Sequence, residues 1–229
     1  MPNHEQIYKN QAEQYDLMIS RQPSLLAVIE EITPIKGHDV IDLGAGSGRL
    51  TSVLAPHAKS ILALDASAAM LEVNAHQLTQ AGLSNWKTSV ADHRELPADD
   101  NSADVLVAGW TVCYLTSSEV PNNELNLEKI IQEMKRVLRP GGTIVIMETM
   151  GTGYETPHPP EFLTQYYSLL ENKYGFSHKW IRLDYQFTDI AEAEQLSRFF
   201  FGEELGNRVA REKLVTLPEC AGVWWLTPH

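Results

Sequence analysis

The stretch Val40–Leu50, VIDLGAGSGRL, begins as an apolar run, passes through three glycines that alternate with small residues, and resumes with helix-forming residues. An apolar strand that turns through glycines into a helix lets a ligand approach the main chain closely, and the helix N-terminus presents free N–H groups to it. The ligand classes that use such a loop are nucleoside triphosphates, dinucleotides and nucleosides that carry an amino acid.

The residues around the glycines favour one of these classes. A triphosphate loop requires a lysine and a hydroxyl after its last glycine, but Gly48 is followed by Arg49 and Leu50. A dinucleotide loop prefers a third glycine where Arg49 stands, so NAD is disfavoured without being excluded. Asp42 precedes the glycines, and a carboxylate there suits an amino group better than a pyrophosphate. The loop therefore favours an adenosyl amino acid.

The loop lies within a regular alternation of strands and helices. We expect strands at 39–44, 60–65, 86–90, 103–110 and 143–149, and helices at 47–57, 67–81 and 125–138. Ser67 is a predicted N-cap, Gly82 a predicted helix stop, and the segment from Arg139 to Gly142 a turn. This alternation predicts right-handed crossovers and a parallel, doubly wound sheet that binds its ligand beyond the carboxyl ends of the strands.

The two ends of the chain lie outside this alternation. Residues 1–35 read as two helices, and residues 150–229 read as a loop, a helix (160–173), a strand (179–187), a helix or helix pair (189–213) and a strand (220–227). The closing strands lack a repeated crossover, so we expect an antiparallel edge. The predicted fold is α/β, with a doubly wound, mostly parallel seven-stranded sheet and an antiparallel edge strand.

Composition limits the partners. The chain has 229 residues and a formal net charge of −12, from 18 Lys and Arg against 30 Asp and Glu, which disfavours nucleic acid. The N-terminus lacks a basic stretch followed by an apolar core, and no apolar run is long enough to span a bilayer, so we expect a soluble cytoplasmic protein without a membrane partner. Cys113 and Cys220 lack metal-site spacing, and we expect no metal.

Four segments together resemble the class I S-adenosylmethionine-dependent methyltransferases, in particular the small single-domain members. They are VIDLGAGSGRL, LALDAS, ADHRELPADDNSADVLVAG and EMKRVLRPGGTIVIMET, and they cover about residues 38–149 in the family's order. The resemblance implies a Rossmann-like fold and S-adenosylmethionine as cofactor. It also implies one domain over 1–229, with a helical lid (1–35), a cofactor-binding core (36–149) and a C-terminal part that carries the substrate-side loop (150–229).

The resemblance assigns roles to individual residues. Gly44, Ala45 and Gly46 would line the methionine and ribose, Asp42 would contact the loop or the amino group, and Asp65 would accept hydrogen bonds from the ribose hydroxyls. Met70 is equally explained as core, and Tyr8 and Tyr15 as plain helix packing. The remaining predicted cofactor contacts are Ala66 and Met70 at the adenine, Asp92 at its amine with Ala91 and His93 nearby, and the aromatic side chains of Tyr8, Tyr15 and Trp110.

The acceptor side is less well defined. Methylation of base amines often uses an Asn/Asp-Pro-Pro-aromatic motif after the fourth strand, where this chain has Trp110 to Cys113, and no Pro-Cys motif supports a cysteine nucleophile. Tyr114 and His158 are the candidate catalytic residues. We therefore expect in-line methyl transfer to a small molecule by a monomer or homodimer. The alternatives are a non-catalytic adenosyl-ligand binder and an NAD-linked oxidoreductase, and ligand titration distinguishes them.

Overall fold

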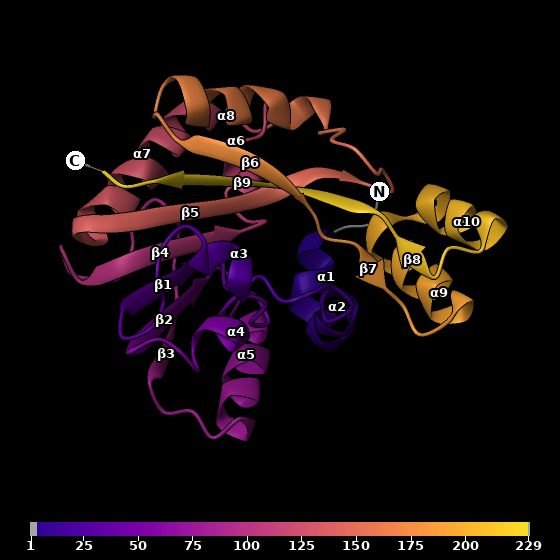
Figure 1. Cartoon of the computed structure of the whole chain (residues 1–229), viewed down its shortest axis with the longest axis horizontal. Helices are drawn as coiled ribbons and strands as arrows, with labels where there is room; N and C mark the ends of the chain where they lie inside the picture. The colour runs from indigo at the N-terminus through magenta and orange to yellow at the C-terminus, as the bar shows by residue number, and fades with distance from the viewer. Residues whose placement is uncertain (1–3, 229) are drawn as a thin grey trace.

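The computed structural model describes residues 4–228 and contains a seven-stranded sheet with the order β3-β2-β1-β4-β5-β9-β6 (Figure 1). Five neighbouring strands are parallel, which confirms the predicted mostly parallel, doubly wound α/β sheet. The bounds are β1 Asp39–Leu43, β2 Ser60–Asp65, β3 Trp86–Val90, β4 Ala103–Gly109, β5 Leu138–Thr152, β6 Ser177–Arg182 and β9 Glu219–Leu226.

The antiparallel strand lies one place inside the edge, which corrects the predicted position. Strand β9 pairs antiparallel with both β5 and β6, so the outermost strand β6 runs in the same direction as β5. The reason is helix α8 (Glu161–Asn172), which provides the crossover from β5 to β6. β9 then inserts between these two strands, and its N-terminal end lies at the carboxyl end of the parallel strands.

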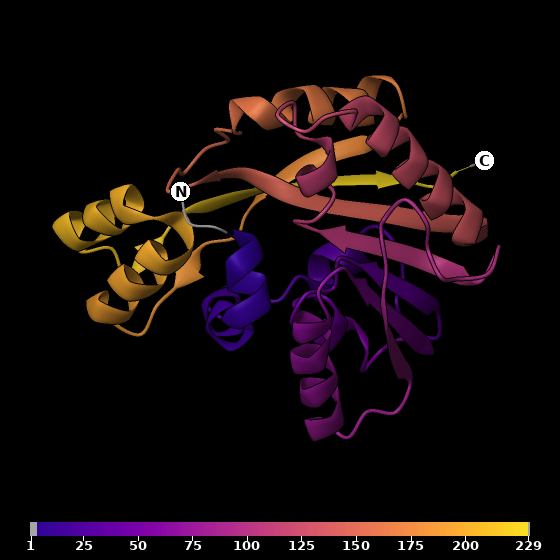
Figure 2. The same ribbon diagram turned by 180° about the vertical axis from the view of Figure 1, so that it is seen from behind.

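Helices cover both faces of the sheet (Figures 1 and 2). One face carries α6 (Cys113–Thr116), α7 (Asn123–Val137) and α8, and the other carries α3 (Leu26–Glu30), α4 (Thr51–Leu54) and α5 (Ala68–Gln80). The predicted helix 47–57 is wrong in length, because Gly46 and Gly48 keep the chain at positive φ before it and Pro56 follows it. The predicted turn at 139–142 instead belongs to an irregular start of β5, where Gly141 has φ +83°.

The segments outside the alternation form a separate layer at the carboxyl end of the sheet. Helices α1 (His4–Asn10) and α2 (Ala12–Ile19) lie between the sheet and a small lobe made of β7 (Tyr185–Gln186), β8 (Thr216–Leu217), α9 (Ile190–Phe201) and α10 (Glu203–Glu212) (Figures 1 and 2). Three short helices thus replace the two predicted before residue 36. The predicted strand 179–187 divides into β6 and β7, and Gly202 at φ +95° divides the predicted helix 189–213 into a pair.

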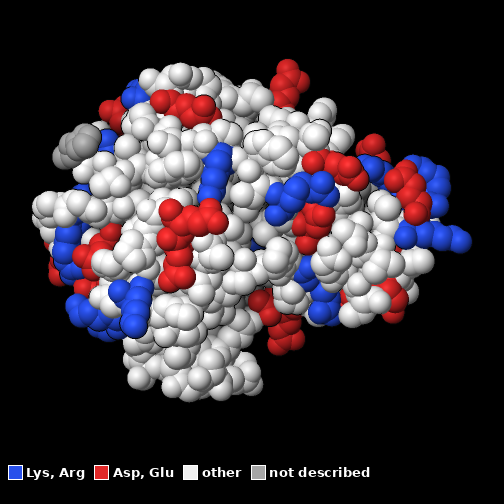
Figure 3. Space-filling model, viewed as in Figure 1, with Lys and Arg blue, Asp and Glu red and all other residues white. Residues whose placement is uncertain are grey.

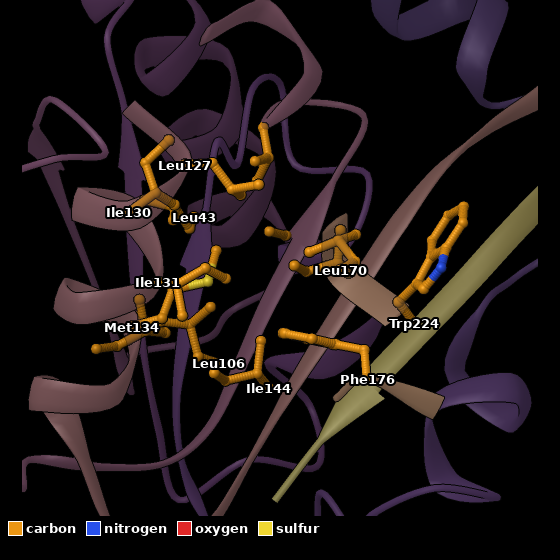
Figure 4. Close-up of a cluster of buried hydrophobic side chains, with 14 of the residues drawn as sticks. Leu43, Leu106, Leu127, Ile130, Ile131, Met134, Ile144, Leu170, Phe176 and Trp224 are labelled. Carbon is orange, nitrogen blue, oxygen red and sulfur yellow. The ribbon is translucent and has the colours of Figure 1, made fainter. Parts of the chain in front are cut away.

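The main core fills the space between the sheet and the helices α7 and α8. Figure 4 shows Leu43, Leu106 and Ile144 from the sheet meeting Ile131 and Met134 of α7. These side chains are at most 2% exposed, and each buried Leu or Ile contributes about 1.5–3 kcal/mol through the hydrophobic effect. This packing fixes the strands, and so it fixes the ends from which the functional residues project.

Candidate functional site

The glycine loop leaves β1 in a conformation that only glycine adopts easily. Gly44, Gly46 and Gly48 have φ values of +70°, +55° and +111°. A Cβ atom added to Gly44 would stand 2.0 Å from Thr111 Oγ1, so the loop after β4 lies directly on this glycine. Because Gly44 has no side chain, the loop after β1 packs closely against Thr111 in the loop after β4.

Asp65 braces the glycine loop from the end of β2. Its Oδ2 accepts a hydrogen bond from the Gly46 amide at 2.9 Å, and its Oδ1 accepts one from the Ser67 amide at 2.8 Å. Ser67 is the N-cap of α5, as predicted, since its hydroxyl accepts from the Met70 amide at 3.4 Å. Burial raises the pKa of Asp65, while the amides of Ser67 and Gly46 oppose that rise. Asp65 thus joins the loop, β2 and α5 at one carboxylate.

Asp42 lies fully buried under the same loop. Its Oδ2 accepts a hydrogen bond from Thr51 Oγ1 at 2.5 Å, while Oδ1 has no partner within residues 4–228. Burial raises the pKa of Asp42 to about 7. The hydroxyl of Ser47 is also buried and, across the described part of the chain, unpartnered. Both residues line a cavity of about 20 Å³ together with Gly44, Gly46 and Tyr15.

These unpartnered oxygens test whether the loop suits the amino acid end of an adenosyl ligand. An ammonium group donates the hydrogen bonds that Asp42 Oδ1 and Ser47 Oγ lack, and it carries the charge that complements a carboxylate. The backbone of Gly44 and Gly46 lines the same cavity as these two oxygens. The residues present therefore fit a ligand with an amino acid group at this point.

On the predicted adenine side, the structure adds partners that sequence reasoning did not foresee. Asp92 is exposed and forms an ion pair with Arg94 at 2.6 Å, and this pairing lowers the pKa of Asp92 to about 2. His93 is buried, which lowers its pKa to about 4, and its Nε2 is hydrogen-bonded to Thr111 Oγ1 at 2.6 Å. Met70 Cε lies 3.3 Å from the position of a Cβ on Gly46, so Met70 borders the glycine loop.

The two alanines predicted at this side lie next to Asp65. Ala91 is buried, and its amide donates to the Asp65 carbonyl at 3.0 Å. Ala66 is exposed at the end of β2. Their contact with adenine stays a prediction, as does that of Asp92.

The predicted lid tyrosines face the loop after β4. The hydroxyls of Tyr8 and Tyr114 are hydrogen-bonded at 2.6 Å, and the rings of Tyr8 and Tyr15 meet edge to face at 5.2 Å. His4 stacks on Phe200 of α9 at 4.3 Å, and its Nδ1 lies 3.3 Å from the Tyr114 hydroxyl. The lid therefore connects the β4 loop with the small lobe.

Trp110 and Arg49 form a pair that connects the glycine loop to the β4 loop. Trp110 has φ +53°, an uncommon conformation for a bulky residue, and the Arg49 guanidinium lies 3.4 Å from its ring centroid. Arg49 also donates to the side-chain carbonyl of Gln22. In the sequence, Arg49 served only as an argument against triphosphate-binding and dinucleotide-binding loops. Nothing in its spacing predicted its contacts with Trp110 and Gln22.

Glu148 and Glu219 are two further buried acids at this end of the sheet. Glu148 Oε1 accepts from the Cys113 amide at 3.0 Å, so it holds the start of α6 after the β4 loop. Glu219 is 2% exposed. Burial raises the pKa of each carboxyl to about 7. The sequence signal for Glu219 was only its position next to a predicted strand.

The second catalytic candidate lies in different surroundings. His158 is exposed and stacks on exposed Tyr154 at 4.2 Å, and its amide donates to the Met150 carbonyl at 2.6 Å. Its contacts thus stay within the loop after β5, whereas Tyr114 touches the lid. The role of each residue in catalysis stays a prediction.

A parallel sheet with this strand order, a glycine loop after β1 and an acid at the end of β2 define a class I S-adenosylmethionine-dependent methyltransferase fold. Residues 41–146 match the family described as Methyltransferase domain. This match covers just under half of the chain, and together with the fold it supports a class I methyltransferase with S-adenosylmethionine as its cofactor.

Particular relatives support this assignment. The chain is 33% identical to a demethylmenaquinone methyltransferase of Clavibacter sepedonicus over 135 residues, which are 59% of this chain and 49% of the relative. It is also 33% identical to a phosphoethanolamine N-methyltransferase 1 of Triticum aestivum over 136 residues, which are 58% and 25% of the two chains. The chain therefore spans about a quarter to a half of the length of these relatives.

A solved structure extends the likeness to almost the whole chain. An S-adenosylmethionine-dependent methyltransferase from Aquifex aeolicus superposes with a TM-score of 0.60 at 18% identity, over 95% of this chain and 98% of that one. At this identity the likeness concerns the fold.

Two features of the described residues bear on partners. Within residues 4–228, no group of three or more His, Cys, Asp or Glu side chains is arranged to hold a metal ion. No helix in that range has the length and apolar character needed to cross a bilayer. Figure 3 shows one face of the molecule, on which basic and acidic side chains are interspersed and form no continuous basic surface.

Proposed function

We propose that this protein is an enzyme that transfers the methyl group of S-adenosylmethionine to a small-molecule acceptor by in-line displacement. The observation that carries the proposal is the enclosure of the carboxyl end of the sheet. Met18 and Ile19 of α2 are buried against Tyr185, Leu196 and Val209 of the small lobe. The space left over the glycine loop is about 20 Å³. Because a space of this size holds about one water molecule, the lid would have to open for the cofactor and the acceptor, and a site that closes to this degree favours a metabolite over a polymer.

Several residues would act on the reactants. When bound, S-adenosylmethionine supplies an electrophilic methyl group on a sulfonium. Asp42 and Ser47 would hold the amino group of its methionine part, and Asp65 would keep the loop in shape while it accepts from the ribose. The lid tyrosines Tyr8 and Tyr15 would exclude water and present aromatic faces toward positive charge. Alignment of the nucleophile with the methyl carbon and sulfur is the main requirement of the reaction.

We infer that the acceptor enters from a second hollow. An open depression of about 520 Å³ is lined by Ser20–Pro23 and by Arg182, Asp184 and Gln186. Gln22 lines this depression, donates to the Leu183 carbonyl at 2.7 Å and accepts from Arg49, which lines the inner cavity. A rotation of the Gln22 side chain would open a path between the two spaces. The relatives named above include enzymes for an amine and for a quinone precursor, so they leave the acceptor open.

The test is direct. The purified protein is incubated with S-adenosylmethionine and a panel of small amines, phenols, quinols and carboxylates, and S-adenosylhomocysteine is measured by chromatography. We expect its formation above the acceptor-free rate with at least one class. Tight binding of S-adenosylhomocysteine without turnover on any class would favour the non-catalytic binder, and binding of NAD with neither adenosyl ligand bound would refute the proposal.

A further inference from the structure

Glu219 is a buried acid on the face of the sheet that packs against Leu50, a residue that follows the glycine loop. It opens the antiparallel strand β9, and that end lies at the carboxyl end of the parallel strands. Side chains alternate along a strand, and Ala221 and Val223 of β9 pack in the cluster that contains Leu50. Glu219 therefore shares their face, and Thr149 Oγ1 donates to Glu219 Oε1 at 3.1 Å from the same side.

One oxygen of this carboxylate lacks a partner. Glu219 is 2% exposed, and the hydroxyls of Thr152 and Thr149 lie near enough to oppose the rise of its pKa, but Oε2 accepts no well-formed hydrogen bond within the described range 4–228. Leaving a buried acceptor unsatisfied costs about 1–3 kcal/mol, and more when the group is charged. Oε2 of Glu219 thus retains hydrogen-bonding capacity, as do Asp42 Oδ1 and Glu148 Oε2 among the described residues.

The groups around Glu219 also retain hydrogen-bonding capacity. Burial raises the pKa values of Glu219, Tyr15 and Tyr185, and the Arg49 guanidinium lies near enough to oppose each rise. The contacts of Arg49 within the described residues are the Gln22 side-chain carbonyl and the Trp110 ring. For neither tyrosine hydroxyl does the described part of the chain supply a hydrogen-bond partner. Tyr15 and Arg49 line the inner cavity. We call Tyr15, Arg49, Tyr185 and Glu219 the polar chamber.

The polar chamber also borders the proposed entrance. The Glu219 amide donates to Asp184 Oδ1 at 3.1 Å, and Asp184 lines the 520 Å³ depression. Glu219 is therefore next to the outer depression, while Arg49 faces the inner cavity. A small molecule that passes Gln22 would meet Arg49, which lines the same cavity as the glycine loop.

We propose that Glu219 binds an amine group of the methyl acceptor, which donates an N–H hydrogen bond to Oε2 inside the polar chamber. This inference rests on the proposed function. An amine fits better than an alcohol for two reasons: a protonated amine balances the charge of a buried carboxylate, and the rings of Tyr15 and Tyr185 attract a cation. An acidic acceptor would face repulsion from Glu219 and Asp65 together.

The experiment measures recognition of small amines by the protein saturated with S-adenosylhomocysteine. Dissociation constants of n-butylamine and n-butanol are determined by ligand-observed NMR at pH 8, where the amine is protonated. We expect the wild-type protein to bind the amine at least tenfold more tightly than the alcohol. Glu219→Gln should lose most of that preference, whereas Glu155→Gln, which removes an exposed carboxylate from the loop after β5, should keep it.

The outcomes distinguish a failure of the proposed amine site from a failure of the proposed methyltransferase function. S-adenosylhomocysteine should bind Glu219→Gln and wild type with the same affinity, and its failure to bind wild type would contradict the proposed function rather than this site. Equal affinity for amine and alcohol, no amine binding, or an amine preference that survives in Glu219→Gln would overturn the role of Glu219. Should Glu219→Gln not fold, Glu219→Asp retains the charge and should retain a preference for the amine, and the absence of an amine preference in either protein would overturn the role of Glu219.

Discussion

Replacing Asp65 by Asn should weaken both the fold around the glycine loop and the binding of the adenosyl ligand. The carboxylate accepts from the Gly46 amide at 2.9 Å and from the Ser67 amide at 2.8 Å. Asn keeps one acceptor oxygen but turns an NH2 group toward the other amide, so one charge-assisted hydrogen bond is lost. Such a bond contributes about 1.5–3 kcal/mol, and that amount corresponds to roughly a tenfold to hundredfold change in an equilibrium constant.

The measurement combines urea denaturation with calorimetric titration of S-adenosylhomocysteine. We expect the free energy of unfolding to fall by about 1.5–3 kcal/mol and the dissociation constant to rise at least tenfold. Asp99→Asn, at an exposed carboxylate in the turn before β4, is the matched control and should change neither quantity. A variant at Asp65 that unfolds and binds like wild type would show that the loop amides do not depend on this carboxylate.

Three further predictions follow from other contacts of the site. Gly44→Ala should lower the free energy of unfolding by about 2–5 kcal/mol, because alanine is strained at a positive φ and its Cβ would clash with Thr111. In a Thr111→Gly background, urea denaturation should show only the cost of the backbone strain. An equal cost in both backgrounds would exclude the clash. Burial raises the pKa of Asp42 to about 7, so the folded state binds the proton of this carboxyl more tightly than the unfolded chain does. The free energy of unfolding should therefore decline as pH rises from about 4 to 7, and this group should contribute a slope approaching ~1.4 kcal/mol per pH unit. Asp42→Asn should reduce that slope in urea titrations at pH 5, 6 and 7, and an unchanged slope would contradict the assignment. Tyr8→Phe and Tyr114→Phe should each accelerate hydrogen exchange in α1, because each removes the same 2.6 Å hydrogen bond between the two hydroxyls. The double variant should therefore exchange little faster than either single variant. Additive effects would mean that the two hydroxyls act separately.

Much of the fold followed from local patterns in the sequence. Apolar runs covered on both faces predicted the five parallel strands, and Ser67 and Gly82 marked where one helix begins and ends. These features are local, because propensity and capping depend on residues a few positions apart. The predictions failed where neighbours in space decide, as at β9, whose place inside the edge depends on the α8 crossover.

For the site, the sequence by itself determined the glycine loop, the acid at Asp65 and the resemblance that names the cofactor. Only the tertiary structure decided which groups meet there. Arg49 lies on Trp110 and Gln22, Asp92 is paired with Arg94, and Glu219 comes from the last strand of the chain to lie near Arg49. Apart from the pair of Asp92 and Arg94, these contacts join residues that are far apart in sequence. Burial also depends on such distant neighbours, so neither spacing nor composition predicts which carboxylate has an unpartnered oxygen and a raised pKa. The cofactor is therefore indicated by four segments of the sequence taken together, whereas the proposed recognition of the acceptor depends on how the lid, the small lobe and β9 pack together.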